Sequence, residues 1–170
     1  MDGLLHPFIV HLPLGLAMLA PLLVLLLAVL DGKGKLTPSA WLAVLLVHVL
    51  LTAGSLAALR SGEAEEELVE RAVPGAALHQ HEEAAELFLW SGVAGLVLAT
   101  VMVLPLGPGL RRVVPFLLLG LSLVTLALGL RTGKAGGELV YRHQAAAARA
   151  GLDIPEGKPV HPLSSHEERP

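Results

Sequence analysis

Four long apolar runs are the feature that most constrains this chain. They cover Phe8–Leu30, Ala40–Leu59, Ala84–Leu104 and Val113–Leu130. Each run is close to the ~20 residues that an α-helix needs to cross the hydrocarbon core of a bilayer. Only 16% of the residues are charged, against about 25% in a typical soluble domain. We therefore expect an all-α protein, a four-helix bundle embedded in the lipid bilayer.

The polar segments between and after these runs predict smaller elements. Residues 63–73 are rich in Glu and predict a short surface helix. A Gly-rich stretch follows the fourth run and predicts a flexible break before an extra juxtamembrane C-terminal helix over about 138–150. Residues 151–170 are rich in Pro, Ser and charge, which is typical of a mobile tail. The bundle would then occupy residues 1–150 as one domain.

The charges in the loops predict the orientation of the bundle. Both short connections carry basic residues, Lys33 and Lys35 in the first and Arg111 and Arg112 in the second, whereas the long middle connection is acidic. The positive-inside rule then places both termini outside the cytoplasm. The formal net charge of −3 gives no reason to expect a nucleic-acid partner. The chain has no cysteine, which excludes disulfides and the CxxCH attachment of c-type haem.

Histidines are distributed unevenly along the chain. After four crossings the N-terminus, the long middle connection and the C-terminal segment share one side of the membrane, and the histidines near that side are His6, His11, His79, His81 and His143. The two short loops on the other side contain none. A histidine inside a membrane is costly unless it faces a partner, a cavity or a bound ion. We therefore expect these side chains to form a binding site at one end of the bundle.

Helical spacing suggests how some of these residues are oriented. His81 shares a face with small and apolar residues, which favours the bundle interior, whereas His79 shares a face with Glu83 and Glu86 and favours the rim. Gly15 follows His11 by one turn, and either leaves room for a planar ligand or lets another helix pack closely. A separate histidine, His48, lies near the middle of the second run, and we favour a buried side chain bonded to a neighbouring carbonyl or hydroxyl.

Convergent imidazoles suit three kinds of chemistry. The first is axial ligation of b-type haem between facing helices. The second is a Cu, Zn or Fe ion held by the same five histidines together with nearby carboxylates. The third is proton relay, since histidine titrates near neutral pH. We rank haem above a metal ion because the sequence supplies apolar walls and glycines such as Gly15, and because its carboxylates cluster on the His79 face.

The favoured hypothesis is a membrane electron carrier that binds one or two b-type haems. His11 and His81 form the first axial pair, because both lie in the first turns of their helices. His6 and His143 form the next pair, or support the first.

Bis-histidine ligation leaves no site for oxygen chemistry, so we expect an electron carrier rather than an enzyme. Arg60 and Arg142 are candidates to pair with haem propionates. Electrons would pass to a redox partner protein or a quinone, and the bundle is a candidate homo-oligomer. The alternative is a metal-binding or non-redox assembly subunit.

Two motifs also carry a resemblance to a known family. His-Pro-x-x-Val-His-x-Pro-x-Gly begins at His6, and Gly-Gly-Glu-Leu-Val-Tyr-x-His ends at His143. Together they resemble a widespread bacterial family of small, four-helix membrane proteins of unknown function. The resemblance implies a multi-pass protein of the bacterial inner (cytoplasmic) membrane, with a fold similar to small membrane b-type cytochromes. It places His6, His11 and His143 at motif positions and His81 at a middle-loop histidine. Family members more often have an aromatic residue in place of Leu12 and a glycine in place of Gln144.

Overall fold

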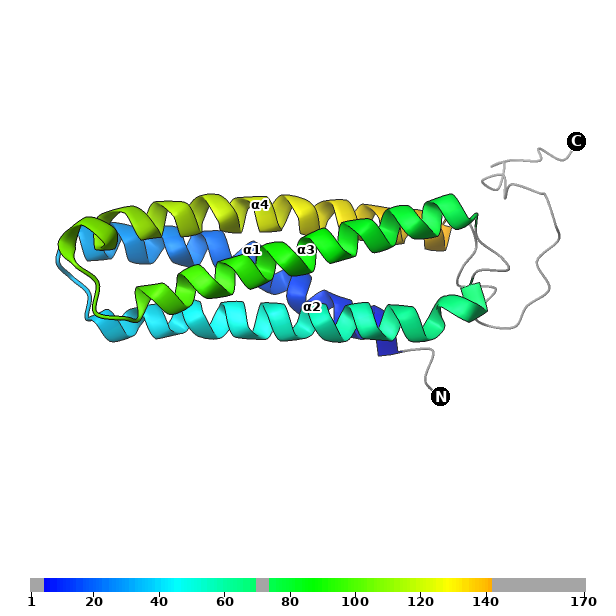
Figure 1. Cartoon of the computed structure of the whole chain (residues 1–170), viewed down its shortest axis with the longest axis horizontal. Coiled ribbons are helices and arrows are strands. Elements are labelled where there is room, and N and C mark those ends of the chain that lie inside the picture. Colours follow the sequence, from blue (N-terminus) through cyan, green and yellow to red (C-terminus); the bar gives the residue numbers. More distant parts are fainter. Residues whose placement is uncertain (1–4, 70–73, 142–170) are drawn as a thin grey trace, which may run out of the picture.

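The computed structural model contains four long helices and one short one, and confirms the predicted all-α membrane bundle. It describes residues 5–69 and 74–141, with the side chains of 9–63 and 74–140. The helices are α1 (Leu5–Gly32), the short 3₁₀ helix η2 (Pro38–Ala40), α2 (Trp41–Val69), α3 (Gly75–Met102) and α4 (Pro108–Tyr141). Figure 1 shows that the four long helices run side by side along one axis.

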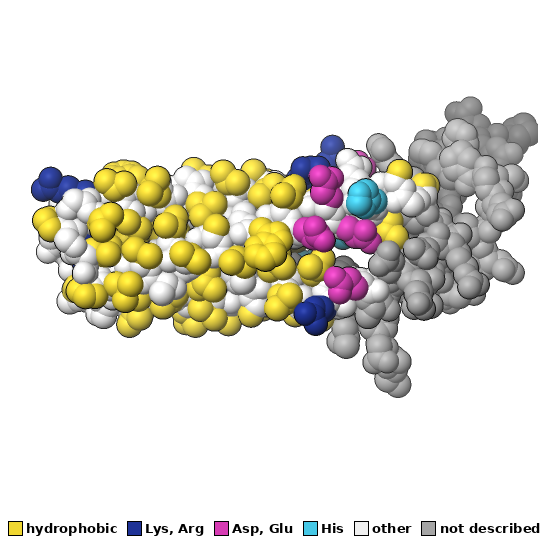
Figure 2. Space-filling model, viewed as in Figure 1, with side chains coloured by type: hydrophobic (Ala, Val, Ile, Leu, Met, Phe, Trp, Pro, Cys, Tyr) yellow, Lys and Arg dark blue, Asp and Glu magenta, His cyan; other side chains and the backbone are white. Residues whose placement is uncertain are grey.

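Each of the long helices has the length and the apolar composition to cross a membrane. The candidate spans are Ile9–Gly32, Pro38–Glu63, Gly75–Met102 and Pro108–Val140. Large apolar side chains point away from the bundle all around it, among them Leu22, Trp90 and Phe116 at 67%, 66% and 70% exposed. Figure 2 shows this apolar surface along most of one face. Such a surface is unfavourable in water and favourable against lipid, so the bundle is built for a bilayer.

The helices follow one another around the bundle. α1 packs against α2 and α4, and α3 packs against the same two helices, so α1 and α3 lie on opposite corners. The starts of α1 and α3 and the ends of α2 and α4 share one end, which we call the histidine end (Figure 1). The short connections 33–40 and 103–107 share the other, which we call the loop end. At the loop end Arg111 of α4 donates a hydrogen bond to Asp31 of α1 across 3.1 Å.

Glycines let the neighbouring helices approach closely. A Cβ added to Gly54 of α2 would lie 3.2 Å from the Pro13 ring of α1, and one added to Gly95 of α3 would lie 2.7 Å from the His48 ring of α2. Gly129 of α4 is equally close to Phe88 of α3, at 3.0 Å. Lipid gives no hydrophobic drive for helix association, so close packing through small residues holds such bundles together.

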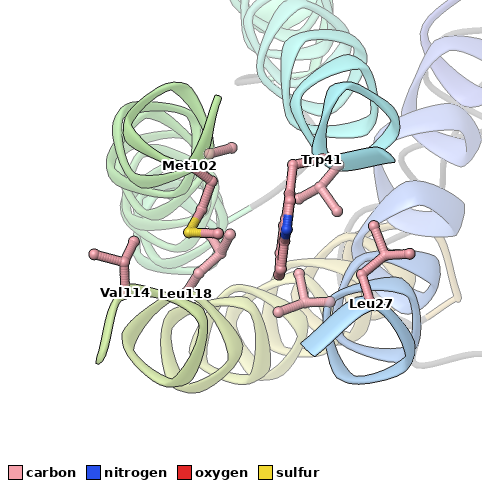
Figure 3. Packing of buried hydrophobic residues seen from close by; sticks show 8 residues of the cluster. Leu27, Trp41, Met102, Val114 and Leu118 are labelled. Atoms are coloured by element: carbon pink, nitrogen blue, oxygen red, sulfur yellow. The ribbon is translucent and has the colours of Figure 1, made fainter. Parts of the chain in front are cut away.

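The largest buried cluster lies towards the loop end. It contains Trp41, which is completely buried, together with residues from all four long helices (Figure 3). The Trp41 ring lies between Leu27 on one side and Met102 on the other. A smaller cluster of Ala17, Leu51 and Phe88 fills the middle of the bundle. The apolar core therefore fills the loop end and the centre of the bundle.

Two helices are longer than the apolar runs suggested. The acidic stretch expected as a separate surface helix over 63–73 is the end of α2 as far as Val69, and α4 continues without a break to Tyr141. For α4 the physical reason lies in Gly136, which packs against the His81 ring of α3. A glycine costs a helix about 1 kcal/mol relative to alanine, and close packing offsets that cost. Residues 70–73 and 142–150 of the expected surface helices lie outside the described residues.

Candidate functional site

The histidine end gathers the segments from which the binding site was predicted. His6 and His11 belong to α1, and His79 and His81 belong to α3. The side chain of His6 is not among those described, and His143 and Arg142 lie outside the described residues. Arg60 is exposed towards the end of α2. The fold therefore brings histidine-bearing segments of α1 and α3 to one end, next to the end of α4 (Figure 1).

His81 packs against α4. A Cβ added to Gly136 would lie 3.1 Å from Cε1 of the imidazole and 3.5 Å from Nδ1, so the ring rests on the bare backbone of α4. His81 is half-buried. Gly136 belongs to the Gly-Gly-Glu-Leu-Val-Tyr motif, and the contact gives a physical role to a glycine that the sequence analysis treated as part of a flexible break. The motif itself was the signal that could have revealed it.

The neighbouring polar residues of α3 form a solvated rim. The His79 side chain is 83% exposed, and its Nδ1 lies 3.9 Å from a carboxylate oxygen of Glu82. Glu83 and Glu86 are exposed as well. In Figure 2 acidic, basic and histidine side chains gather where the apolar surface ends. This part of α3 therefore belongs to the polar end of the bundle.

His11 lies on the outward face of α1. The residues that share its face at helical spacing are Gly15, Met18 and Leu22, and all four are exposed. No atom lies within 4 Å of a Cβ added to Gly15. Among the described residues, then, Gly15 does not serve helix packing, which was one of the two roles considered for it. The open space beside it is compatible with the other role, the approach of a ligand.

His11 and His81 lie at similar depths but on different faces. Leu14, one turn after His11, contacts Gly129 and Gly133 of α4, whereas His81 contacts Gly136. At 1.5 Å per residue these contacts place the two histidines within about one helical turn in depth. α1 and α3 occupy opposite corners, His11 is turned outward and His81 is turned towards α4. The fold aligns the two histidines in depth without directing them at each other.

His48 lies apart from this end, in the interior of the bundle. It is 3% exposed, and its Nδ1 donates a hydrogen bond to the carbonyl oxygen of Val44 across 2.9 Å. This confirms the interpretation of His48 as a buried histidine bonded to a neighbouring carbonyl. Its ring fills the space opposite Gly95 of α3. His48 therefore has a packing role between α2 and α3.

Side chains of the types that bind metals are described only in part at the histidine end. Among those described, no group of three His, Cys, Asp or Glu residues is arranged to hold a metal ion. The side chain of His6 and the whole of His143, two of the five histidines predicted as ligands, lie outside the described residues. Haem brings four nitrogen ligands of its own and needs only one or two from the protein, and His81 and His11 are of the residue type that supplies them.

Comparisons with known proteins identify the family and nothing further. A search of curated proteins and a search of solved structures each find no similar protein. A family model described as "Predicted membrane protein (DUF2231)" matches residues 4–149. The matched range contains all four long helices and both histidine motifs. With most of its length matched and four helices suited to a bilayer, the chain belongs to this family of membrane proteins.

Proposed function

We propose that this protein is a b-type haem protein of the bacterial inner membrane, and that it carries electrons through a haem bound at the histidine end. The observation that carries the proposal is the contact of the His81 ring with the backbone at Gly136. This contact places His81 within about one helical turn of His11 in depth. A ring that rests on a glycine backbone is held in one orientation. Bound haem would supply one-electron chemistry through its iron.

Several residues of the chain are candidates to bind the haem iron and its propionates. His81 would be the first protein ligand of the haem iron, and His11, at a similar depth, would be the second. Arg60 and Arg142 pair with the propionates at the aqueous rim. His6 and His143 would be a second pair of ligands or would hold the first pair in place. Haem held by two imidazoles would supply electron transfer to a redox protein or a quinone rather than oxygen chemistry.

The basic loops support an orientation with this site outside the cytoplasm. Lys33, Lys35, Arg111 and Arg112 lie at the loop end or next to it. Cytoplasmic loops carry an excess of Lys and Arg. The proposed haem is therefore accessible from the outer face of the membrane.

A visible spectrum of the purified protein tests the proposal. The protein is expressed with ample haem, purified in detergent, and measured oxidised and reduced, with iron, copper and zinc quantified on the same sample. A sharp reduced α-band with stoichiometric iron is the expected result. A colourless sample with bound copper or zinc would assign the histidines to a metal site instead. A colourless, metal-free sample would refute both and leave an assembly subunit.

Histidine substitutions test the assignment of the ligand. His81→Ala is expected to abolish or convert the low-spin spectrum, and so is His11→Ala. His79→Ala is the matched control, because it lies two residues from His81 on the same helix and is 83% exposed. His48→Ala is a second control from the interior. A spectrum that survives His81→Ala and disappears with His48→Ala would place the haem in the middle of the bundle and overturn the site proposed here.

A further inference from the structure

An apolar groove runs between α1 and α4 on the outside of the bundle. Its volume is about 300 Å³, at the lower end of the roughly 300–1,000 Å³ of ligand pockets. Glycine and alanine leave the space that larger side chains would fill. The residues that line it are Leu14, Ala17, Met18, Leu126, Gly129, Leu130, Gly133 and Lys134. Every lining residue except Lys134 is apolar or glycine, so the groove suits a hydrocarbon chain.

The groove opens to the lipid. Met18 on the α1 side is 59% exposed and Leu130 on the α4 side is 63% exposed. Both belong to candidate membrane spans. From Leu126 to Lys134 the groove extends about 12 Å along the helix axis. A lipid chain that lies parallel to the helices can therefore enter it from the side without any helix moving.

Lys134 ends the groove with a positive charge. It is exposed, and it lies one turn beyond Leu130, or about 6 Å along the axis, in the direction of the histidine end. Figure 2 shows charged side chains gathered at this end of the bundle. None of the ion pairs found between described residues involves Lys134. Its ammonium group is thus available to an anion at the depth of the lipid headgroups.

We propose that this groove is a binding site for an anionic phospholipid, with an acyl chain between α1 and α4 and the phosphate on Lys134. The positive charge of Lys134 favours an anionic phospholipid over the other possible occupants. A second copy of the chain would have to cover Lys134, and an unpaired charge inside a helix contact is costly. A neutral quinone would fill the groove but leave the ammonium group unneutralised. A phospholipid with a net negative headgroup matches both the apolar groove, with its acyl chain, and Lys134, with its phosphate.

Native mass spectrometry of the full chain tests the charge recognition. The protein is released from nanodiscs that contain equal amounts of phosphatidylglycerol and phosphatidylcholine, which differ in net charge. We expect the released protein to retain one lipid, with phosphatidylglycerol preferred. Lys134→Gln should reduce that preference about fivefold, equivalent to the ~1 kcal/mol that one basic residue contributes at an anionic membrane surface. Lys134→Arg should preserve it.

Two control variants separate the groove from general effects of charge and helix composition. Arg131→Gln also removes one positive charge, at a residue that lies less than one turn from Lys134 and does not line the groove. Gly133→Leu fills the groove, since its Cβ would meet only Leu14, at an ordinary 3.8 Å. Gly120→Leu makes the same change at an exposed site on α4 with no atom within 4 Å. Arg131→Gln and Gly120→Leu should bind lipid as the parent protein does, and Gly133→Leu should lose it.

Several results would overturn the proposal. Equal retention of the two lipids by the parent protein would remove the role of Lys134, and so would an equal loss in Lys134→Gln and Arg131→Gln. Lipid retained by Gly133→Leu at the parent level would place it outside the groove. A bound neutral quinone, or a dimer without lipid, would assign the groove to another occupant. Far-UV circular dichroism of each variant verifies that the bundle is folded.

Discussion

Replacement of Gly95 by alanine tests the packing of the bundle interior most directly. The new Cβ would lie 2.7 Å from Cδ2 of His48 and 3.1 Å from its Nε2. Carbon atoms pack best at about 3.5–4.0 Å, so the two helices would have to separate by about 1 Å. The His48 ring has little freedom to move away, because it is 3% exposed and fixed by its bond to Val44.

The expected cost follows from two opposing effects. Overpacking of a filled core costs about 1–3 kcal/mol, while the change from glycine to alanine favours the helix by up to about 1 kcal/mol. We therefore expect Gly95→Ala to lower the free energy of unfolding by up to about 2 kcal/mol. Gly120→Ala, where no atom lies within 4 Å, should be neutral or stabilising. Unfolding by SDS in mixed micelles, followed by far-UV circular dichroism, measures both.

A double-mutant cycle tests whether the contact with His48 causes the loss of stability in Gly95→Ala. His48→Ala alone should destabilise by leaving a cavity and by removing the bond to Val44. In the His48→Ala background Gly95→Ala should cost little, which gives a coupling energy of up to about 2 kcal/mol for residues in contact. If Gly95→Ala is as well tolerated as Gly120→Ala, or if the two changes are additive, the described contact between α2 and α3 is wrong.

Three further predictions concern other contacts between helices. Asp31→Asn should destabilise the bundle by less than about 1 kcal/mol, because the ion pair with Arg111 is partly exposed; unfolding at low and high salt measures this. Thr132→Val should cost at most about 0.6 kcal/mol, the average for hydrogen bonds between membrane helices, because its hydroxyl lies 2.9 Å both from the carbonyl oxygen of Ala84 in α3 and from that of Leu128 in its own helix, and can donate to either. Gly136→Val should displace the His81 ring from α4, and a lower haem content in the purified protein is the expected result.

Each of these predictions has a control. Exchanging the two charges, as Asp31→Arg with Arg111→Asp, should restore part of the lost stability. Thr125→Val should cost less than Thr132→Val, since the Thr125 hydroxyl donates only within its own helix. Gly137→Val is the control for Gly136→Val, because no atom lies within 4 Å of its Cβ. A haem content that falls equally in both valine variants would contradict the role of the His81 contact.

The sequence was sufficient for the number of helices and the end at which the histidines gather. Both follow from hydrophobic length and from the direction of each crossing, which need no knowledge of packing. His48 was also predictable, because a histidine in the middle of a span must satisfy its polar atoms within the protein.

The sequence was not sufficient to orient α1. Periodicity shows that His11, Gly15 and Met18 share a face, but α1 is apolar all around, so no polar face distinguishes lipid from interior. The inward face was set instead by shape, with the buried Pro13 ring against Gly54. The same limit applies to Gly136. In the sequence it belongs to a glycine-rich stretch that predicts a break, and only its contact with His81 identifies it as a helix packing site.

The start of α3 is polar where the rest of the helix is apolar. Leu87 is the first large apolar residue of α3 that is exposed, and α3 begins at Gly75, roughly 18 Å further out along the helix axis. His81 lies about 9 Å beyond Leu87 along the same axis. A ligand held by His81 would therefore lie close to the end of the bundle, far from the buried cluster around Trp41.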